Sequence, residues 1–171
     1  MAISIRAARP DEDPILRAVE RDAGERFRTV GLAAIADNEP TSDAFIAAIR
    51  AHGVALCAVD DDDKAIGFLL AGRLDQSLHV YELSVATVWG GQGIGRRLMA
   101  EVADEARRLG IASLTLATFR DVPWNRPFYE RLGFVEVPPE GWTPAFHLLH
   151  AAERLAGLPI ERRLFMRKEI S

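Results

Sequence analysis

Four glycines and two arginines stand close together in the middle of the chain, in the segment Trp89-Gly90-Gly91-Gln92-Gly93-Ile94-Gly95-Arg96-Arg97. Glycine allows positive φ angles and a close approach of a ligand to the main chain. The apolar spacing that follows predicts a helix, whose first turn offers unpaired N–H groups and a positive dipole end. Both features favour phosphate. The segment is therefore a candidate phosphate-binding loop.

Two common phosphate-binding loops do not fit this segment. A Walker A loop ends in Gly-Lys-Ser or Gly-Lys-Thr, whereas arginines follow Gly95. The dinucleotide-binding fingerprint needs a third glycine at the position of Arg96. A plain strand-to-helix turn without a ligand stays open at this point.

A second group of residues could move protons. Asn125 and Tyr129 stand four residues apart, which places them on one face of a helix predicted over residues 124–132. Glu82 falls in a strand predicted over residues 77–86, where a carboxylate is costly unless it is paired or faces a wet cleft. Tyr129 is equally compatible with a packing role, and Glu82 with a salt-bridged or solvent-facing one.

Strand alternation predicts the directions of the side chains around this glutamate. Glu82 and Ser84 are expected to share one face of the strand. The opposite face is expected to carry Tyr81, Leu83 and Val85.

Hydrophobic spacing predicts the elements that position these residues. The predicted strands span residues 3–7, 54–59, 65–71, 77–86, 113–118, 134–137 and 162–170. The predicted helices span residues 10–27, 42–53, 94–109, 124–132 and 143–156. Strands alternate with helices in the second half, which indicates an α/β or α+β layered sheet. No repeat or low-complexity linker divides residues 1–171, so we expect a single domain.

Composition excludes several classes of protein. Of the 171 residues, 49% are apolar and 27% are charged, which is typical of a folded globular chain. The net charge of −4 and the lack of a long basic run argue against nucleic-acid binding. The single cysteine, Cys57, forms no intrachain disulfide or cysteine-based zinc site, and we expect it to pack. We find no signal peptide and no membrane-length apolar run, so we expect a cytoplasmic protein without a membrane partner.

Residues 83–98 resemble the acetyl-CoA-binding motif of the GNAT acyltransferase superfamily. In that family, Arg or Gln stands three residues before the first of two spaced glycines; Gly93 and Gly95 match the glycines, and the leading position is Gly90. Residues 125–134 are similar to a second family pattern, an Asn, a Tyr four residues later and a Gly-Phe that opens a strand. The resemblance covers nearly the whole chain. It implies a mixed, mostly antiparallel sheet of six or seven strands flanked by helices.

The resemblance also implies an activity, the transfer of an acetyl group from acetyl-CoA to a primary amine by direct attack in a ternary complex. In the family the loop holds the CoA pyrophosphate largely through main-chain amides. The glycine at position 90, in place of Arg or Gln, therefore bears on the affinity for CoA more than on the identification of the motif. The expected cofactor-binding residues are Leu83, Val85, Gly90, Gly91, Gln92, Gly93, Ile94, Gly95, Arg96 and Asn125.

The family's chemistry assigns roles to individual residues. The resemblance implies Tyr129 as the general acid near the CoA sulfur, and Glu82 as the base, directly or through water. Main-chain N–H groups near Leu83 and Val85 are the implied donors to the oxyanion. Asn125 is expected to bond the pantetheine or phosphate portion.

The acceptor is less clearly marked. In the family its pocket is shaped by the first two helices and the segment between them, here about residues 25–37. Phe27 could line it, although a core role fits equally well. No strongly charged groove is visible for a protein tail, which favours a small-molecule amine.

Several alternatives stay open. The chain could be a CoA-binding or acyl-CoA-binding regulatory module without turnover, or a protein N-terminal or lysine acetyltransferase. His147, His150 and Glu153 recur at helical spacing, which we interpret as a polar helix face rather than a metal site, so no metal is expected. The family is often dimeric, so a homodimer is one option.

Overall fold

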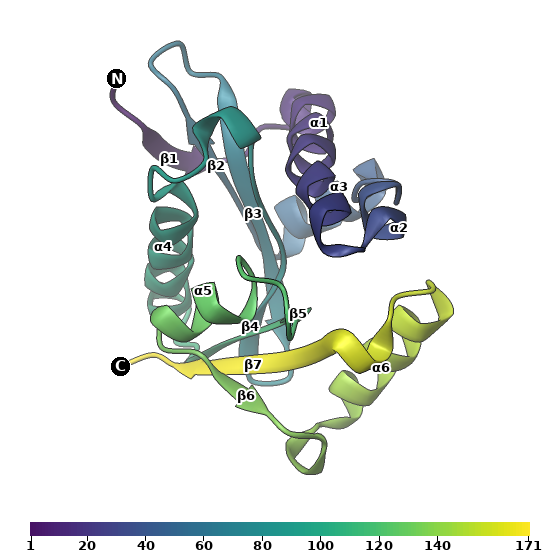
Figure 1. The fold of residues 1–171 in the computed structure, drawn as a ribbon. Coiled ribbons are helices and arrows are strands. Elements are labelled where there is room, and N and C mark those ends of the chain that lie inside the picture. The colour runs from purple at the N-terminus through teal and green to yellow at the C-terminus, as the bar shows by residue number, and fades with distance from the viewer.

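A seven-stranded sheet forms the centre of the computed structural model, which describes residues 1–171, and helices cover both faces of the sheet (Figure 1). The strands are β1 (Ser4–Ala7), β2 (Val54–Val59), β3 (Ala65–Leu74), β4 (Ser77–Val85), β5 (Ser113–Phe119), β6 (Val135–Val137) and β7 (Arg163–Glu169). Their order is β1-β2-β3-β4-β5-β7-β6, and only the β4–β5 pair is parallel. The predicted mixed, mostly antiparallel sheet is confirmed.

Six α-helices connect and cover the strands. They are α1 (Asp13–Gly24), α2 (Ala33–Ala36), α3 (Asp43–His52), α4 (Ile94–Arg108), α5 (Arg126–Arg131) and α6 (Pro144–Leu155). The long helix predicted over residues 10–27 is divided, because short 3₁₀ turns at Pro10–Glu12 (η1) and Glu25–Val30 (η2) flank α1. The short α2 was not predicted, since four residues give no measurable periodicity. None of the helices has the length and apolar character needed to span a membrane.

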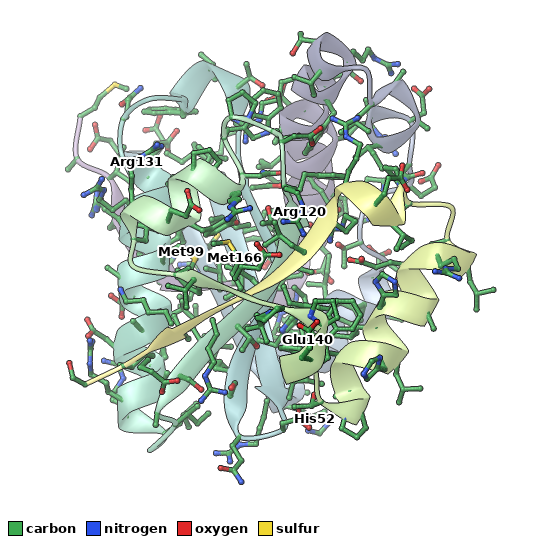
Figure 2. The ribbon with its side chains drawn as sticks, turned by 60° about the horizontal axis from the view of Figure 1, so that its bottom comes forward. His52, Met99, Arg120, Arg131, Glu140 and Met166 are labelled. Carbon is green, nitrogen blue, oxygen red and sulfur yellow. The ribbon has the colours of Figure 1, made fainter.

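The two faces of the sheet carry separate hydrophobic layers. The α4 face packs Leu98 and Met99 of α4 against strand residues that include Met166 of β7, and both methionines lie near the centre of the molecule in Figure 2. The opposite face packs Leu16 of α1 and Ile46 of α3 against the sheet. Both helical layers thus hold the central strands in place from opposite sides.

A β-bulge in β4 shapes the middle of the sheet. Leu70 of β3 pairs with Glu82, but its neighbour Ala71 pairs with Val80, so Tyr81 is the extra residue. Tyr81 therefore packs on the α1 and α3 face, with its ring 5.2 Å from that of Phe45. The prediction that Tyr81 shares a face with Leu83 and Val85 is wrong, because regular alternation does not allow for a bulge.

The same strand separates from its parallel neighbour just beyond the bulge. The pairing of β4 with β5 covers only Leu78–Val80 against Leu114–Leu116. From Glu82 onward, β4 pairs with β3 alone. The second half of β4 therefore has one edge that no strand covers, and side chains there can face a cavity.

Candidate active site

Two cavities adjoin along the free half of β4. The first, which we call the loop cavity, has a volume of about 380 Å³ and lies among the glycine loop, β4 and α5. The second, the α1 cavity, has a volume of about 300 Å³ and lies among α1, η2, β4 and β5. Residues that line both are Ala23, Arg26, Leu83, Asn125 and Tyr129. A molecule in one cavity would therefore meet a molecule in the other at these side chains.

The glycine loop presents its main chain to the loop cavity. Gly91 and Gly93 have φ angles of +76° and +77°, a region that side chains with a Cβ rarely adopt. The N–H groups of residues 91–96 form no hydrogen bond within the protein, and that of Arg97 is the first to bond, to the Gly93 carbonyl at 3.0 Å. Six successive free donors at the start of a 15-residue helix suit an anion such as a pyrophosphate.

The predicted cofactor residues fall into two groups. Nine of the ten line the loop cavity: Leu83, Val85, Gly90, Gly91, Gly93, Ile94, Gly95, Arg96 and Asn125. Gln92 does not line it, although its main-chain N–H is one of the six free donors. Gly90 has an ordinary φ of −62° and ends the 3₁₀ turn Thr87–Trp89 (η3), so its backbone does not require glycine.

Tyr129 stands where the two cavities meet. Its N–H donates to the Asn125 carbonyl at 3.1 Å, which fixes the start of α5 and puts both side chains on the cavity-facing side, as their spacing predicts. Its ring makes edge contacts with Phe128 and Phe134 at centroid distances of 5.0 and 5.8 Å. Burial, together with the nearby Glu82 carboxylate, raises the pKa of Tyr129 above its usual value. The phenol is therefore protonated at neutral pH and can act as a proton donor.

Glu82 faces the α1 cavity from the free half of β4. Ser84 Oγ donates to Glu82 Oε1 at 2.7 Å, so these two residues share a face, as predicted. Burial and the Glu20 carboxylate raise the pKa of Glu82 to about 7, against the smaller opposing effect of the Ser84 hydrogen bond. A carboxylate with this pKa can take up a proton near neutral pH.

Glu20 of α1 is the second carboxylate of the same cavity. It accepts hydrogen bonds from the N–H and the hydroxyl of Thr41, at 3.0 and 3.2 Å. Burial raises the pKa of Glu20, and the bonds from Thr41 oppose that rise. Two partly desolvated carboxylates thus face one cavity.

Phe27 combines the two roles that the sequence left open. It lines the α1 cavity, and its ring also packs at 5.5 Å from those of Phe119 and Trp124.

Arg26, its neighbour, was not singled out from the sequence, since several arginines stand nearby and only the tertiary structure tells which of them has a carboxylate partner.

The remaining candidates line neither cavity. Cys57 is fully buried in the layer under α1 and α3, and burial raises the pKa of its thiol to about 12. The rings of His147 and His150 pack against Trp142, at 5.3 and 4.8 Å. Glu153 forms an ion pair with Arg163 at 2.5 Å.

Comparison with known proteins gives the family. The sequence model of the acetyltransferase (GNAT) family matches residues 16–134, well over half of the chain. The chain belongs to the GNAT acetyltransferase family. The glycine loop and both catalytic candidates, Glu82 and Tyr129, fall inside the matched region.

Solved structures of other GNAT proteins share this fold. The PaiA N-acetyltransferase from Thermoplasma acidophilum, solved with coenzyme A, is 18% identical over 99% of both chains, with a TM-score of 0.72. A ribosomal-protein alanine N-acetyltransferase from Escherichia coli is 17% identical over 99% of this chain and 95% of its own, with a TM-score of 0.68. The N-acetylglutamate synthase from Neisseria gonorrhoeae, solved with coenzyme A and N-acetyl-glutamate, is 18% identical and has a TM-score of 0.71. All of this GNAT chain matches 36% of that synthase.

Proposed function

We propose that this GNAT protein is an N-acetyltransferase that moves an acetyl group from acetyl-CoA to the primary amine of a small molecule. The observation that carries the proposal is the junction of the two cavities. A row of free main-chain donors lines one side of it, the partly buried phenol of Tyr129 stands at the centre, and a carboxylate with a pKa of about 7 faces the other side.

The loop cavity is the proposed donor site. The free N–H groups of residues 91–96 would hold the pyrophosphate of acetyl-CoA, and Arg96 adds a positive charge at the same wall. Asn125 would bond the pantetheine arm. Gly90 offers no side chain where the family has Arg or Gln. The free main-chain N–H groups of residues 91–96 support binding of the pyrophosphate without that side chain. The coenzyme A in two similar structures supports the same assignment.

Transfer of the acetyl group needs a base, an oxyanion donor and an acid. Glu82 would accept the proton of the attacking ammonium group, directly or through water. A main-chain N–H near Leu83 or Val85, on the free half of β4, would bond the oxyanion. Tyr129 would give its proton to the leaving thiolate, since a phenol is protonated at neutral pH and this one stands where the two cavities meet.

Direct attack by the amine is favoured over a cysteine intermediate. Cys57 lines neither cavity, and its raised pKa keeps the thiol protonated. The α1 cavity, at about 300 Å³, has the size of a small-ligand pocket. This supports a small molecule rather than a protein tail as the acceptor. A cytoplasmic location stays a prediction from the sequence.

The test is a release assay for free CoA thiol, with acetyl-CoA and a panel of small amines and short peptides. We expect release with small amines and initial-rate lines that intersect when both substrates are varied. Binding of acetyl-CoA without release for any acceptor would favour a regulatory module. Release with peptides alone would favour a protein acetyltransferase, and parallel lines would contradict direct attack.

A further inference from the structure

The arginines of the α1 cavity differ in their partners. Arg21 forms an ion pair with Glu39 at 3.5 Å. Arg163 forms one with Glu153 at 2.5 Å. Arg26 alone has no carboxylate within ion-pair distance, although it lines both cavities. The guanidinium of Arg26 is therefore free to bind an anion from outside the chain.

Aromatic contacts hold this guanidinium in place. Its Cζ atom lies 4.6 Å from the centre of the Trp124 ring, a cation–π arrangement. Trp124 in turn packs against Phe27 at 5.5 Å. The guanidinium is partly desolvated there, which lowers the pKa of Arg26 but leaves it charged, and no carboxylate offsets the desolvation. The Nε1 donor of Trp124 is also buried without a hydrogen-bond partner.

The α1 cavity also has two carboxylates that form no ion pair, although Arg17 and Arg163 lie near enough to attract Glu20 and Glu82. Glu82 and Glu20 accept hydrogen bonds from Ser84 and Thr41, and neither forms an ion pair with an arginine or lysine. They come from β4 and α1, whereas Arg26 comes from η2. Because charges that face a cavity are costly when unpaired, this arrangement suits a ligand that carries both signs.

We propose that the acceptor is a free amino acid or a similarly small amino-carboxylate, whose carboxylate binds Arg26 and whose ammonium group faces Glu82 and Glu20. The inference rests on the proposed function, because it names the class of amine that enters the α1 cavity. The volume of about 300 Å³ matches a ligand of this size. Arg26 is then a specificity residue, and the carboxylate contact turns the amine toward Glu82.

The experiment compares acceptors that differ only in the carboxylate. The pairs are leucine with isoamylamine, phenylalanine with phenethylamine and alanine with ethylamine. Leucinamide, in which an uncharged amide replaces the carboxylate of leucine, is a further acceptor. For each acceptor, kcat/KM is measured for the wild type and for Arg26→Gln, so that the intrinsic reactivity of the amine cancels in the ratio. The loss of a charge-assisted contact predicts a fall of about 10- to 100-fold for the amino acids. The simple amines and leucinamide should change little.

Arg28→Gln is the matched control, since it removes an arginine of the same turn, η2, that is paired with Glu25 and Asp37 and lines neither cavity. It should leave both classes of acceptor nearly unchanged, and thermal melts should show that both variants fold. An equal loss on amino acids and amines would overturn the inference, as would a wild type that accepts only the amines. A weaker affinity of Arg26→Gln for acetyl-CoA, with amino acids unaffected, would move Arg26 to the donor site and also overturn it. If no acceptor releases thiol and acetyl-CoA does not bind, the proposed function itself fails.

Discussion

Replacement of Glu82 by glutamine should lower activity and raise stability at the same time. Burial raises the pKa of Glu82 from its ordinary value of 4.5 to about 7. Between these pH values the folded protein keeps a proton that the unfolded chain has lost, so stability falls as pH rises through this range. Each pKa difference of one is worth about 1.36 kcal/mol. The ionised carboxylate therefore lowers the free energy of unfolding above pH 7 by at most about 3 kcal/mol, part of it shared with Glu20.

The effect on activity has the opposite sign. A general base contributes about 10²- to 10⁴-fold to a proton transfer, so kcat should fall by a factor in that range. In the wild type, kcat/KM should rise with a slope of one below about pH 7, because only the ionised Glu82 can accept the proton of the ammonium group. Above that pH the profile should level off. The Glu82→Gln profile should instead keep rising with a slope of one up to the pKa of the acceptor amine, because without the base the amine must enter in its neutral form.

Two measurements check both halves of this prediction. Thiol release between pH 5 and pH 10 gives the rate profiles, and urea unfolding at pH 5 and pH 8 gives the stabilities. Glu39→Gln is the control, because Glu39 lines the same cavity with a side chain that is 82% exposed. An unchanged pH–rate profile in Glu82→Gln, or a variant less stable than the wild type at pH 8, would refute the assignment of Glu82 as a desolvated base.

Three further predictions follow from single residues. Tyr129→Phe should lower kcat by about 10²-fold or more without weakening acetyl-CoA affinity; calorimetric titration beside turnover checks this, and unchanged turnover would remove Tyr129 as the acid. Gly93→Ala should cost about 1 kcal/mol of stability and weaken acetyl-CoA binding, because φ is +77° there; the control Gly24→Ala has open space around its Cβ and should do neither. Burial lowers the pKa of His79 to about 4, so stability should fall by up to about 3 kcal/mol as pH drops from 6.5 toward 4. Urea unfolding of His79→Gln should lack this component of the pH dependence, and an unchanged pH dependence would contradict the buried neutral histidine.

Local pattern was enough to predict most of the fold. The run at Val54–Val59 has the predicted bounds, because an unbroken apolar stretch between Gly53 and an acidic turn leaves few other choices. The helix from Ile94 to Arg108 begins at the predicted residue, since Gly93 has the positive φ that ends the loop. The family match covers the same region.

The geometry of the candidate site could be predicted only in part. Helical spacing was enough to place Asn125 and Tyr129 on the cavity side of α5. The bulge at Tyr81 was not visible, because it arises from the pairing of β4 with β3 and not from a local motif. The free charge of Arg26 was missed for a similar reason, since ion pairs join residues from different elements.

The donor site can be tested by calorimetric titration with acetyl-CoA, with ATP and NAD as controls. We expect selective binding of acetyl-CoA, which weakens in Gly93→Ala and persists in Tyr129→Phe. No heat with acetyl-CoA at high protein concentration and at two temperatures, or equal binding of all three nucleotides, would contradict the assignment of the loop cavity as the donor site.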